Sequence, residues 1–599
     1  METNQKSVNI GGSFIITETN PNDIFTPEDF TEEHKMMRDS VIEFVDREIV
    51  PKKQRFEQKD YKLTEKIMSK IGELGFLGVS VPEQYGGLGM GFVSTMLVCD
   101  YISGASGSIS TAFGAHTGIG ILPIVLYGTE EQKQKYLPNL ASGKWIGSYC
   151  LTEPGSGSDA NSGKTKAVLS DDGSYYRISG QKMWISNAGF ASLFIVFARI
   201  EDDKNITGFL IPNEPGNGIT LGDEENKLGI HSSSTRQVFF NETKVPIENM
   251  LGERQQGFKI AMNALNVGRV KLGVACLEAQ RRVITEAVKY SNERIQFKSP
   301  ISSFGAIKEK ISQMATSCYI GESACYRAAK DIENRTEFLL SEGMSHQESE
   351  LKGVEDFAIE CSLIKIGISE DIMNCTDEGI QIFGGMGFSA EAPMESAWRD
   401  ARIGRIYEGT NEINRMLSVG MLLKKGMKGQ INLMEAVMNA KSDLLKKLDK
   451  KDVPINIMSN ETELLINLKK IFLILVGKVV EKYGQGLDEK QQVLISLSDI
   501  LIEIYLIDSG LKRTTKNINR SDKESQSSQI KMTQLYLHEA NEIILKKSKD
   551  IIYSTLEGKE KLELLDLVKK TCDYKSCPNI FDLKTEIANK IINENKYCF

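Results

Sequence analysis

The stretch that organises the rest of the sequence is RIGRIYEGTNEI, residues 402–413. It places one acid, Glu408, between an aromatic residue and a glycine. Glycine has no Cβ, so a ligand can approach the backbone beside Glu408 closely. The neighbouring Tyr407 can shield the carboxylate from water, which raises its pKa towards the range of a useful base. The pattern predicts a catalytic carboxylate, although an acid beside a glycine is also common at helix ends.

The size and composition of the chain restrict what surrounds this stretch. With 599 residues it is too long for one hydrophobic core, so we expect several domains. Its 41% hydrophobic and 26% charged residues are typical of a globular protein. A net charge of -8 argues against a nucleic-acid-binding protein.

The cysteines and the first residues bear on metal binding and cellular location. The ten cysteines form no Cys-x-x-Cys pair and there are five histidines, so no metal site is expected. Scattered cysteines fit a reducing compartment. Residues 1–28 are polar and acid-containing, unlike a secretion signal or a mitochondrial transit peptide. We therefore expect a bacterial cytoplasmic protein, in preference to one of the mitochondrial matrix.

Hydrophobic periodicity divides the chain into five parts. We expect an N-terminal tail (1–30), a helical domain (31–148), a β domain (149–255), a helical bundle that carries Glu408 (256–430) and a C-terminal helical extension (431–599). Thr129 is expected to cap a helix. The β-rich runs of the third part are 175–179, 193–198, 208–211 and 237–240.

The C-terminal extension is lysine-rich, and helical periodicity is clear at 464–482, 491–511 and 530–547. The polar residues 514–528 are expected to form a mobile loop. A lysine-bearing helix face can lie weakly on anionic lipid, but it is more often the solvated face of a bundle helix. The most apolar run, 471–480, is interrupted by Lys478 and is too short to span a bilayer.

Four further motifs accompany residues 402–413. They are YCLTEPGSGSD (149–159), KMWISN (182–187), RIQF (294–297) and QIFGGMGF (381–388). Taken in this order and spacing, they resemble the acyl-CoA dehydrogenase family over roughly residues 30–430. The extension resembles that of the very-long-chain branch of the family. The resemblance implies a mainly α fold with an inserted β-barrel domain, a homodimer, and FAD bound between the barrel and the bundle.

By this resemblance, Thr152 donates to the flavin, and Arg294 and Gln296 reach the FAD pyrophosphate of the partner subunit. An arginine suits that task because its charged fork is bidentate. Glycines and small hydroxyls in the 149–159 motif let backbone N–H groups approach phosphates. The implied FAD contacts are Tyr149, Leu151, Thr152, Gly157, Ser158, Trp184, Ile185, Ser186, Arg294, Gln296, Phe304, Gly305, Gln381, Gly384, Gly385, Thr410, Asn411 and Glu412.

The resemblance also makes Glu408 the base that removes the α-proton of an acyl thioester. The thioester oxygen then accepts hydrogen bonds from the Glu408 N–H and from the FAD ribityl hydroxyl, which stabilises the developing enolate. In some relatives the base stands instead on a long helix of the bundle, and the matching position in this sequence is Gly268. The departure argues against an isovaleryl-type substrate. The implied substrate contacts are Ser158, Asn266, Arg269, Tyr407, Gly409, Gly114 and Gly118.

The expected length of the substrate's acyl chain is inferred from Gly114 and Gly118, which stand where bulkier residues close the pocket in medium-chain relatives. Small residues there would leave a deeper slot, unless they serve helix packing. We therefore expect a long-chain acyl-CoA as substrate, a trans-2-enoyl-CoA as product and electron-transfer flavoprotein as electron acceptor. An acyl-CoA oxidase, and a scaffold protein that binds partners through 431–599, remain as alternatives. No nucleic-acid partner is expected.

Overall fold

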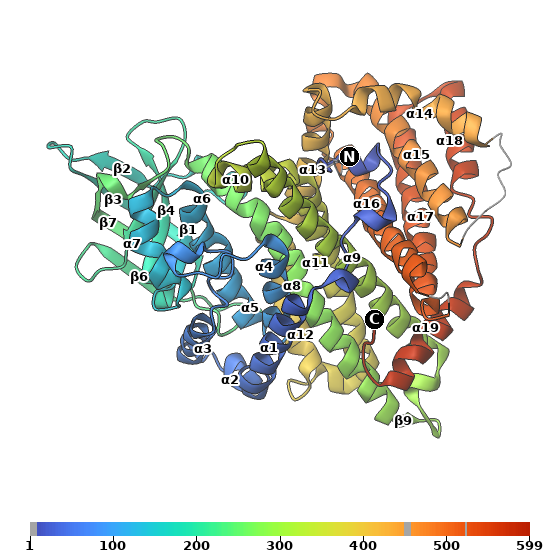
Figure 1. The fold of residues 1–599 in the computed structure, drawn as a ribbon, viewed down its shortest axis with the longest axis horizontal. Helices are drawn as coiled ribbons and strands as arrows, with labels where there is room; N and C mark the ends of the chain where they lie inside the picture. Colours follow the sequence, from blue (N-terminus) through green and yellow to red (C-terminus); the bar gives the residue numbers. More distant parts are fainter. Residues whose placement is uncertain (1–8, 449–456, 522–523) are drawn as a thin grey trace, which may run out of the picture.

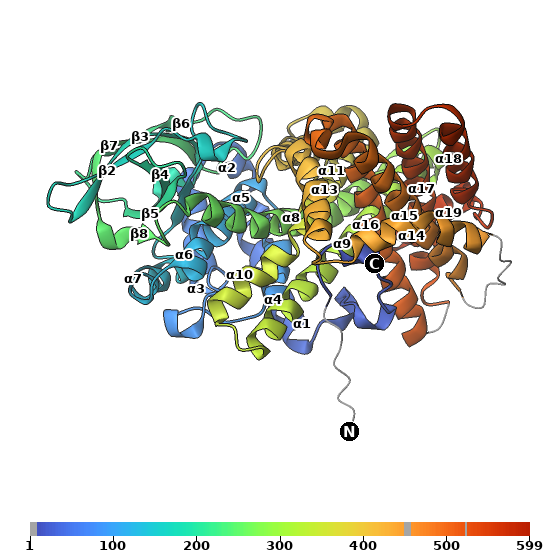
Figure 2. The same cartoon turned by 90° about the horizontal axis from the view of Figure 1, so that it is seen from above.

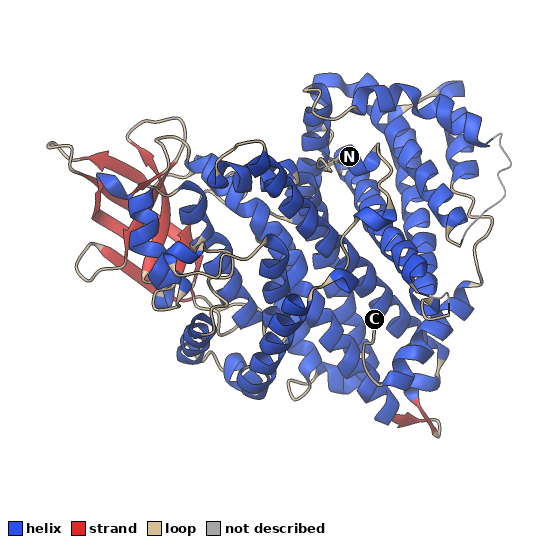
Figure 3. Cartoon of the chain, viewed as in Figure 1, coloured by secondary structure: helices blue, strands red, loops and turns tan. Residues whose placement is uncertain are grey.

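A computed structural model describes residues 9–448, 457–521 and 524–599. The described part is mainly helical, with a β domain at one end and the C-terminal helices at the other (Figures 1 and 3). The N-terminal helices are α1 (Glu32–Glu48), α2 (Lys53–Glu57), α3 (Tyr61–Glu73), α4 (Phe92–Ser103), α5 (Gly107–Gly114), α6 (Leu122–Tyr127) and α7 (Glu130–Ala141), with a π-helical turn Ala115–Gly120 between α5 and α6. The expected cap at Thr129 is confirmed, because its side chain accepts a hydrogen bond from Gln132 N at 3.2 Å.

The β domain is built on one sheet of eight strands among the described residues. Its order is β6-β7-β3-β2-β4-β5-β8, with β1 paired to β4. The four predicted β-rich runs lie in β3, β4, β5 and β7 and are confirmed. The strands are β1 (Gly147–Cys150), β2 (Lys166–Leu169), β3 (Tyr175–Ser186), β4 (Leu193–Ile200), β5 (Thr207–Pro212), β6 (Ile219–Glu224), β7 (Thr235–Pro246) and β8 (Met250–Leu251).

Strand β4 shows how the sheet is fixed between two cores. Alternate side chains of a strand point to opposite faces. Leu193, Ile195 and Phe197 join a core with residues of α6 and α7, while Phe194 and Val196 join the interior core of the β domain. Because both faces are buried, this strand reads as a continuous apolar run.

The helical bundle after the β domain is organised around α8 (Gly257–Glu293), which begins beside the β domain and runs through the middle of the molecule (Figure 2). It packs against α4 and α11. The remaining elements are the hairpin β9 (Ile295–Gln296) and β10 (Ser299–Pro300), and the helices α9 (Gly305–Ser341), α10 (His346–Asp356), α11 (Ala358–Phe383), α12 (Pro393–Arg402) and α13 (Asn411–Met427).

Two helical stretches have the length and composition of membrane spans. They are Gly107–Tyr127 and Gly257–Glu293, and 78% of the most apolar window of each is buried inside the protein. Their apolar character is accounted for by the core that they form.

The C-terminal extension packs on the bundle through α16, which contacts α9, α11 and α13. The apolar side chains of the extension and the bundle form one continuous core. The helices are α14 (Leu433–Leu448), α15 (Ser459–Tyr483), α16 (Gln491–Arg520), α17 (Ser527–Thr555), α18 (Gly558–Thr571) and α19 (Ile580–Glu594).

The prediction of a mobile loop at 514–528 is wrong for most of this stretch. Helix α16 continues to Arg520, and α17 begins at Ser527; residues 522–523 lie outside the described part. Thr514, Lys516 and Asn517 are buried in this stretch, which composition alone does not reveal. Thr514 Oγ1 lies 3.0 Å from the Tyr319 hydroxyl, and Lys516 Nζ donates to Asp29 Oδ2 at 2.6 Å.

The chain before α1 is a strap, residues 10–29, that lies against the extension (Figure 1). Phe14 is buried, and its ring contacts that of Tyr505 on α16 edge to face, with 4.9 Å between centroids. Strap acids pair with α16: Glu28 with Arg513 at 2.7 Å, and Asp29 with Arg520 at 2.7 Å. The segment expected to be a tail is therefore packed from residue 10 onwards.

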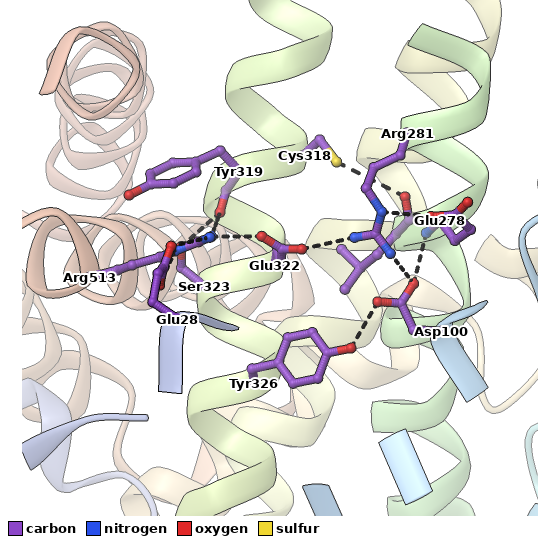
Figure 4. Close-up of polar contacts among 11 residues, drawn as sticks. Glu28, Asp100, Glu278, Arg281, Cys318, Tyr319, Glu322, Ser323, Tyr326 and Arg513 are labelled. Atoms are coloured by element: carbon purple, nitrogen blue, oxygen red, sulfur yellow. Dashed lines mark hydrogen bonds and ion pairs between the residues drawn. The ribbon is translucent and has the colours of Figure 1, made fainter. Parts of the chain in front are cut away.

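A buried ionic chain joins the strap to the interior of the bundle (Figure 4). Arg513 on α16 bridges Glu28 at 2.7 Å and Glu322 on α9 at 2.8 Å. Glu322 in turn pairs with Arg281 on α8 at 2.9 Å, and Arg281 pairs with Asp100 on α4 at 2.6 Å. The ionic chain, Glu28–Arg513–Glu322–Arg281–Asp100, therefore connects the strap with the four helices α16, α9, α8 and α4.

Candidate active site

Glu408 sits in a backbone turn that costs energy to hold. Its φ is 58° and that of Gly409 is 79°, so two successive residues are left-handed. A non-glycine residue rarely adopts this conformation, and such strain collects at functional sites. Asn414 holds the turn through its Nδ2, which donates to the carbonyls of Glu408, Gly409 and Thr410 at 3.3, 2.9 and 3.1 Å.

A lysine that the sequence analysis missed fixes the same turn from α11. Lys365 Nζ donates to Gly409 O at 2.8 Å and to Asn411 Oδ1 at 2.6 Å. Burial lowers the pKa of Lys365 to about 7, against the opposing effect of Glu408. A single lysine within the apolar run SLIKIGIS of α11 is the sequence signal that points to such a buried role.

The Glu408 carboxylate packs directly on the backbone of α8 at Gly268. A Cβ at position 268 would lie 2.5 Å from Glu408 Oε2 and 2.8 Å from its Cδ. The glycine is therefore required by the carboxylate that faces it. Among the described residues, Glu408 Oε2 has no hydrogen-bond partner although the protein buries it.

We expect Gly268→Ala to lower kcat by about 10- to 100-fold, because the added methyl group displaces the carboxylate from its position. The measurement is steady-state turnover with an artificial electron acceptor. Gly420→Ala is the matched control, since a Cβ there meets nothing within 4 Å. Turnover of Gly268→Ala within twofold of the control would show that the contact is unimportant.

Burial and the nearby cations have opposite effects on the pKa of Glu408. Burial raises its pKa to about 7, while Arg269, Lys365 and Lys271 lower it. Arg269 Nε donates to Glu408 O at 3.4 Å, and its Nη1 donates to Asn266 Oδ1 at 2.7 Å. The predicted substrate contacts Asn266 and Arg269 thus lie beside the base.

A small cavity of about 70 Å³ opens in front of the carboxylate. Its wall includes Glu408, Tyr407, Gly114, Ser186 and Lys271. A larger cavity of about 890 Å³ shares part of that wall. The shared residues are Ser110, Thr111, Leu272, Ala275 and Tyr407. The base therefore faces a space that continues between α5 and α8.

The two glycines expected to deepen the slot have different surroundings. Gly114 lines the small cavity, and a Cβ there would meet nothing within 4 Å. A Cβ at Gly118 would lie 3.5 Å from Lys271 Cδ, so Gly118 leaves space for the lysine stem. Of the pair, Gly114 is the residue whose small size enlarges the cavity.

The β-domain motifs meet at an irregularity of β3. The pairing of β3 with β7 shifts between Lys182 and Ile185, and Trp184 within this bulge has a φ of 59°. Its side chain is 54% exposed, which is unusual for tryptophan. Met183 N donates to Thr152 O at 3.0 Å, so the 149–159 turn lies beside the tryptophan.

A buried ion pair holds this arrangement in place. Lys182 Nζ donates to Glu153 Oε1 at 2.7 Å and to Phe197 O at 2.7 Å. Asn187 Nδ2 donates to Ala112 O on α5 at 2.9 Å, which joins the end of β3 to the cavity wall. The exposed Trp184, the open space beside Gly157 and the buried, unpartnered Tyr149 hydroxyl suit a flat ligand with polar edges.

Thr410, Asn411 and Glu412 directly follow the Glu408 turn, whereas the remaining predicted cofactor residues lie far from this group. The β9–β10 hairpin stands at the end of the molecule remote from the β domain (Figure 1). Stacking of Tyr290 on Phe383, with 4.1 Å between ring centroids, brings the hairpin close to the turn after α11. Arg294, Gln296, Phe304, Gly305, Gln381, Gly384 and Gly385 therefore form a second, remote group.

Four family models match the chain. They are "Acyl-CoA dehydrogenase, N-terminal domain" at residues 31–144, "middle domain" at 148–243, and two models described as "C-terminal domain" at 255–422 and 467–570. A probable acyl-CoA dehydrogenase of Bacillus subtilis (strain 168) is 39% identical over 98% of this chain and 98% of its own length. A very long-chain specific mitochondrial acyl-CoA dehydrogenase of Rattus norvegicus is 35% identical over 76% of this chain and 71% of its own.

Solved structures agree with these matches. The crystal structure of an acyl-CoA dehydrogenase complexed with FAD from Bacillus anthracis has a TM-score of 0.95 and 39% identity, and the match covers 99% of this chain and 100% of that one. A butyryl-CoA dehydrogenase from Megasphaera elsdenii has a TM-score of 0.59 and 33% identity, over 66% of this chain and 99% of that one. The shorter match leaves a third of this chain without a counterpart.

Proposed function

The chain belongs to the acyl-CoA dehydrogenase family, and from this we propose that it oxidises a long-chain fatty acyl-CoA to the trans-2-enoyl-CoA. The coarser activity, dehydrogenation of an acyl-CoA, goes with membership of the family. The observation that carries the proposal is the Glu408 carboxylate, which is held in a strained turn and faces a cavity with one oxygen unpartnered.

Glu408 is proposed to take the α-proton of the bound thioester. A carboxylate whose pKa is raised to about 7 is both ionised and basic enough near neutral pH. Among the described residues, none accepts a hydrogen bond from the Glu408 N–H. That N–H is therefore free to donate to the thioester oxygen, which stabilises the enolate as charge develops.

FAD is the cofactor that this site fits. Tyr149, Thr152, Trp184 and Ser186 would hold its flavin portion beside the small cavity. When bound, FAD supplies an acceptor for the β-hydride. The chain's own part is to orient the thioester, remove the α-proton and exclude water from the cavity.

A homodimer accounts for the two separated groups of cofactor residues. The remote group is surrounded by exposed apolar side chains: Phe297 is 90% exposed and Phe388 is 88% exposed. Aromatic residues left in water mark a surface for a partner. We propose that this end of one protomer reaches the FAD of the other, with Arg294 and Gln296 near its pyrophosphate.

The long-chain preference is proposed on the space beside Gly114. Gly114→Gln should lower kcat/KM for palmitoyl-CoA by about 100-fold or more while that for butyryl-CoA changes by less than about tenfold, because the new side chain takes up cavity space beside Gly114 that a long acyl chain needs and a four-carbon chain does not. The measurement is a series of acyl-CoA chain lengths with each variant. Gly114→Ala is the graded control, and we expect an intermediate profile. Parallel losses for all chain lengths would contradict the assignment.

Electron-transfer flavoprotein is the proposed acceptor, and a bacterial cytoplasmic location agrees with the Bacillus relatives. Anaerobic titration with palmitoyl-CoA tests the whole proposal. Bleaching of the flavin absorbance supports dehydrogenation. Peroxide formation during turnover in air would favour an oxidase. Bound FAD with no bleaching by any acyl-CoA would favour the scaffold alternative.

A further inference from the structure

Lys271 is a charged group in the reaction cavity for which the proposed mechanism has no role so far. It lies on α8, three residues after Gly268, and lines the same small cavity as Glu408. Its side chain is 5% exposed. Its Nζ donates to the Thr117 hydroxyl at 3.1 Å. Among the described residues, Lys271 forms no ion pair, and Cys99 and Glu408 are the groups that act on its charge.

A buried ammonium without a carboxylate partner is costly, so such a group calls for an explanation. The other two cations near Glu408 are engaged by oxygen acceptors: Arg269 by Asn266, and Lys365 by Gly409 and Asn411. These acceptors are neutral, as is the Thr117 hydroxyl that accepts from Lys271. Of the three cations, Lys271 is the one in the wall of the small cavity, so its charge acts across that space.

The ionisable groups facing Lys271 come from several elements. Burial raises the pKa of Cys99 on α4 to about 11, so this thiol is neutral near pH 7. Burial lowers the pKa of His116 in the π-helical turn to about 4, so this imidazole is also neutral. Burial raises the pKa values of Tyr149 and Tyr407 beside Glu408. Glu408 is then the anion that Lys271 faces, and it shares this carboxylate with Arg269 and Lys365.

We propose that Lys271 is a positioning residue for proton transfer, whose ammonium keeps Glu408 in its carboxylate form inside the cavity. The proposal rests on Glu408 being the base. Lys271 and Glu408 line the same cavity of about 70 Å³. An acyl chain that fills this cavity excludes water and lowers the local dielectric constant, which strengthens the attraction between the two charges.

The sign of the effect follows from this arrangement. Burial lowers the pKa of Lys271 to about 8 and raises that of Glu408 to about 7, so both groups are charged between these values. Removing the ammonium leaves burial less opposed, and the pKa of Glu408 rises further. The base is then protonated at pH values where it is normally ionised, so activity falls on the acid side first.

The experiment follows proton removal without oxidation. A 3-thia-acyl-CoA has sulfur in place of the β-carbon, so it can lose an α-proton but has no β-hydride. The α C–H bond breaks, the proton passes to Glu408, the electron pair stays on the enolate, and a deuteron returns from the same carboxyl group in D2O. Exchange at the α-carbon of this ligand on the FAD-loaded enzyme is measured by NMR from pH 5 to 10.

Lys271→Met should raise the midpoint of the exchange profile by about one pH unit, equivalent to about tenfold slower exchange well below the midpoint. Near pH 9 the rate should stay within about twofold of wild type, because Glu408 is ionised in both proteins. Lys271→Gln keeps a hydrogen-bond donor for Thr117 and should raise the midpoint by the same amount. It replaces Lys271→Met as the test if the methionine variant folds poorly. Lys259→Met removes an exposed lysine from the same helix and should shift nothing.

Thr117→Val separates the charge of Lys271 from its hydrogen bond. Because the ammonium stays, its profile should remain near that of wild type. An unchanged midpoint in both Lys271→Met and Lys271→Gln, with wild-type exchange abolished by Glu408→Gln, overturns the inference alone. Absence of exchange in the wild-type enzyme, or its survival in Glu408→Gln, overturns the proposed base instead.

Discussion

Glu408→Gln is expected to lower kcat by about 1,000-fold or more, at the upper end of what a general base contributes. The amide has nearly the shape of the carboxylate, so it still fits against Gly268 and leaves the left-handed turn intact. It cannot accept the α-proton. FAD content, measured by flavin absorbance, should equal that of wild type, because the change lies at the reacting end of the site.

The pH dependence of the wild-type enzyme is part of the same expectation. Since burial raises the pKa of Glu408 to about 7, kcat/KM should rise with pH through that region and fall away on the acid side. Glu342→Gln, at an exposed acid after α9, is the matched control. Turnover of Glu408→Gln within tenfold of wild type would remove Glu408 from the role of base.

Arg513→Leu is expected to destabilise the protein by about 3–5 kcal/mol, the usual cost of removing one partner from a buried ion pair. Arg513 is 2% exposed and holds both Glu28 and Glu322. Leucine would leave the Glu322 carboxylate short of one cation inside the bundle. The loss should be seen as a lower midpoint of urea unfolding, followed by tryptophan fluorescence.

Arg520→Leu provides the comparison within the same helix. Arg520 also pairs with a strap acid, Asp29, but its side chain is 47% exposed. Exposed pairs contribute about 0–1 kcal/mol, so this variant should unfold close to wild type. If both variants lowered the midpoint of urea unfolding equally, the buried ion pairs of Arg513 would contribute no more to stability than the exposed pair of Arg520.

Sequence patterns predicted those parts of the molecule whose side chains follow a local period. The four β runs and the helices at 464–482, 491–511 and 530–547 were visible because alternation and helical spacing are properties of neighbouring residues. Glu408 could be proposed from its neighbours Tyr407 and Gly409, and the resemblance supplied its role. The resemblance supplied the FAD residues, and their two separate groups became apparent only in three dimensions.

What the sequence concealed were polar residues with distant partners. Lys271 shows its place beside Glu408 only when α4, α8 and the Glu408 turn are brought together, and the apolar run around Lys365 indicates burial but not its partners. Residues 514–520 have a loop-like composition, yet Thr514 meets Tyr319 and Lys516 meets Asp29, far away along the chain. Likewise, the reason for Gly268 is the Glu408 carboxylate, about 140 positions later. Contacts between residues so far apart in the chain produce no periodic pattern among sequence neighbours, so sequence patterns do not reveal them.

The strap also has a consequence for biosynthesis. Glu28 and Arg513 are 485 positions apart, so the first part of the chain to leave the ribosome must wait for one of the last. At about 5–20 residues per second, the delay is about 25–100 s. During that time the strap acids and the apolar face of Phe14 have no partner. Closure of the strap on α16 is therefore a late step, and a newly made chain stays open at this edge until α16 has been synthesised.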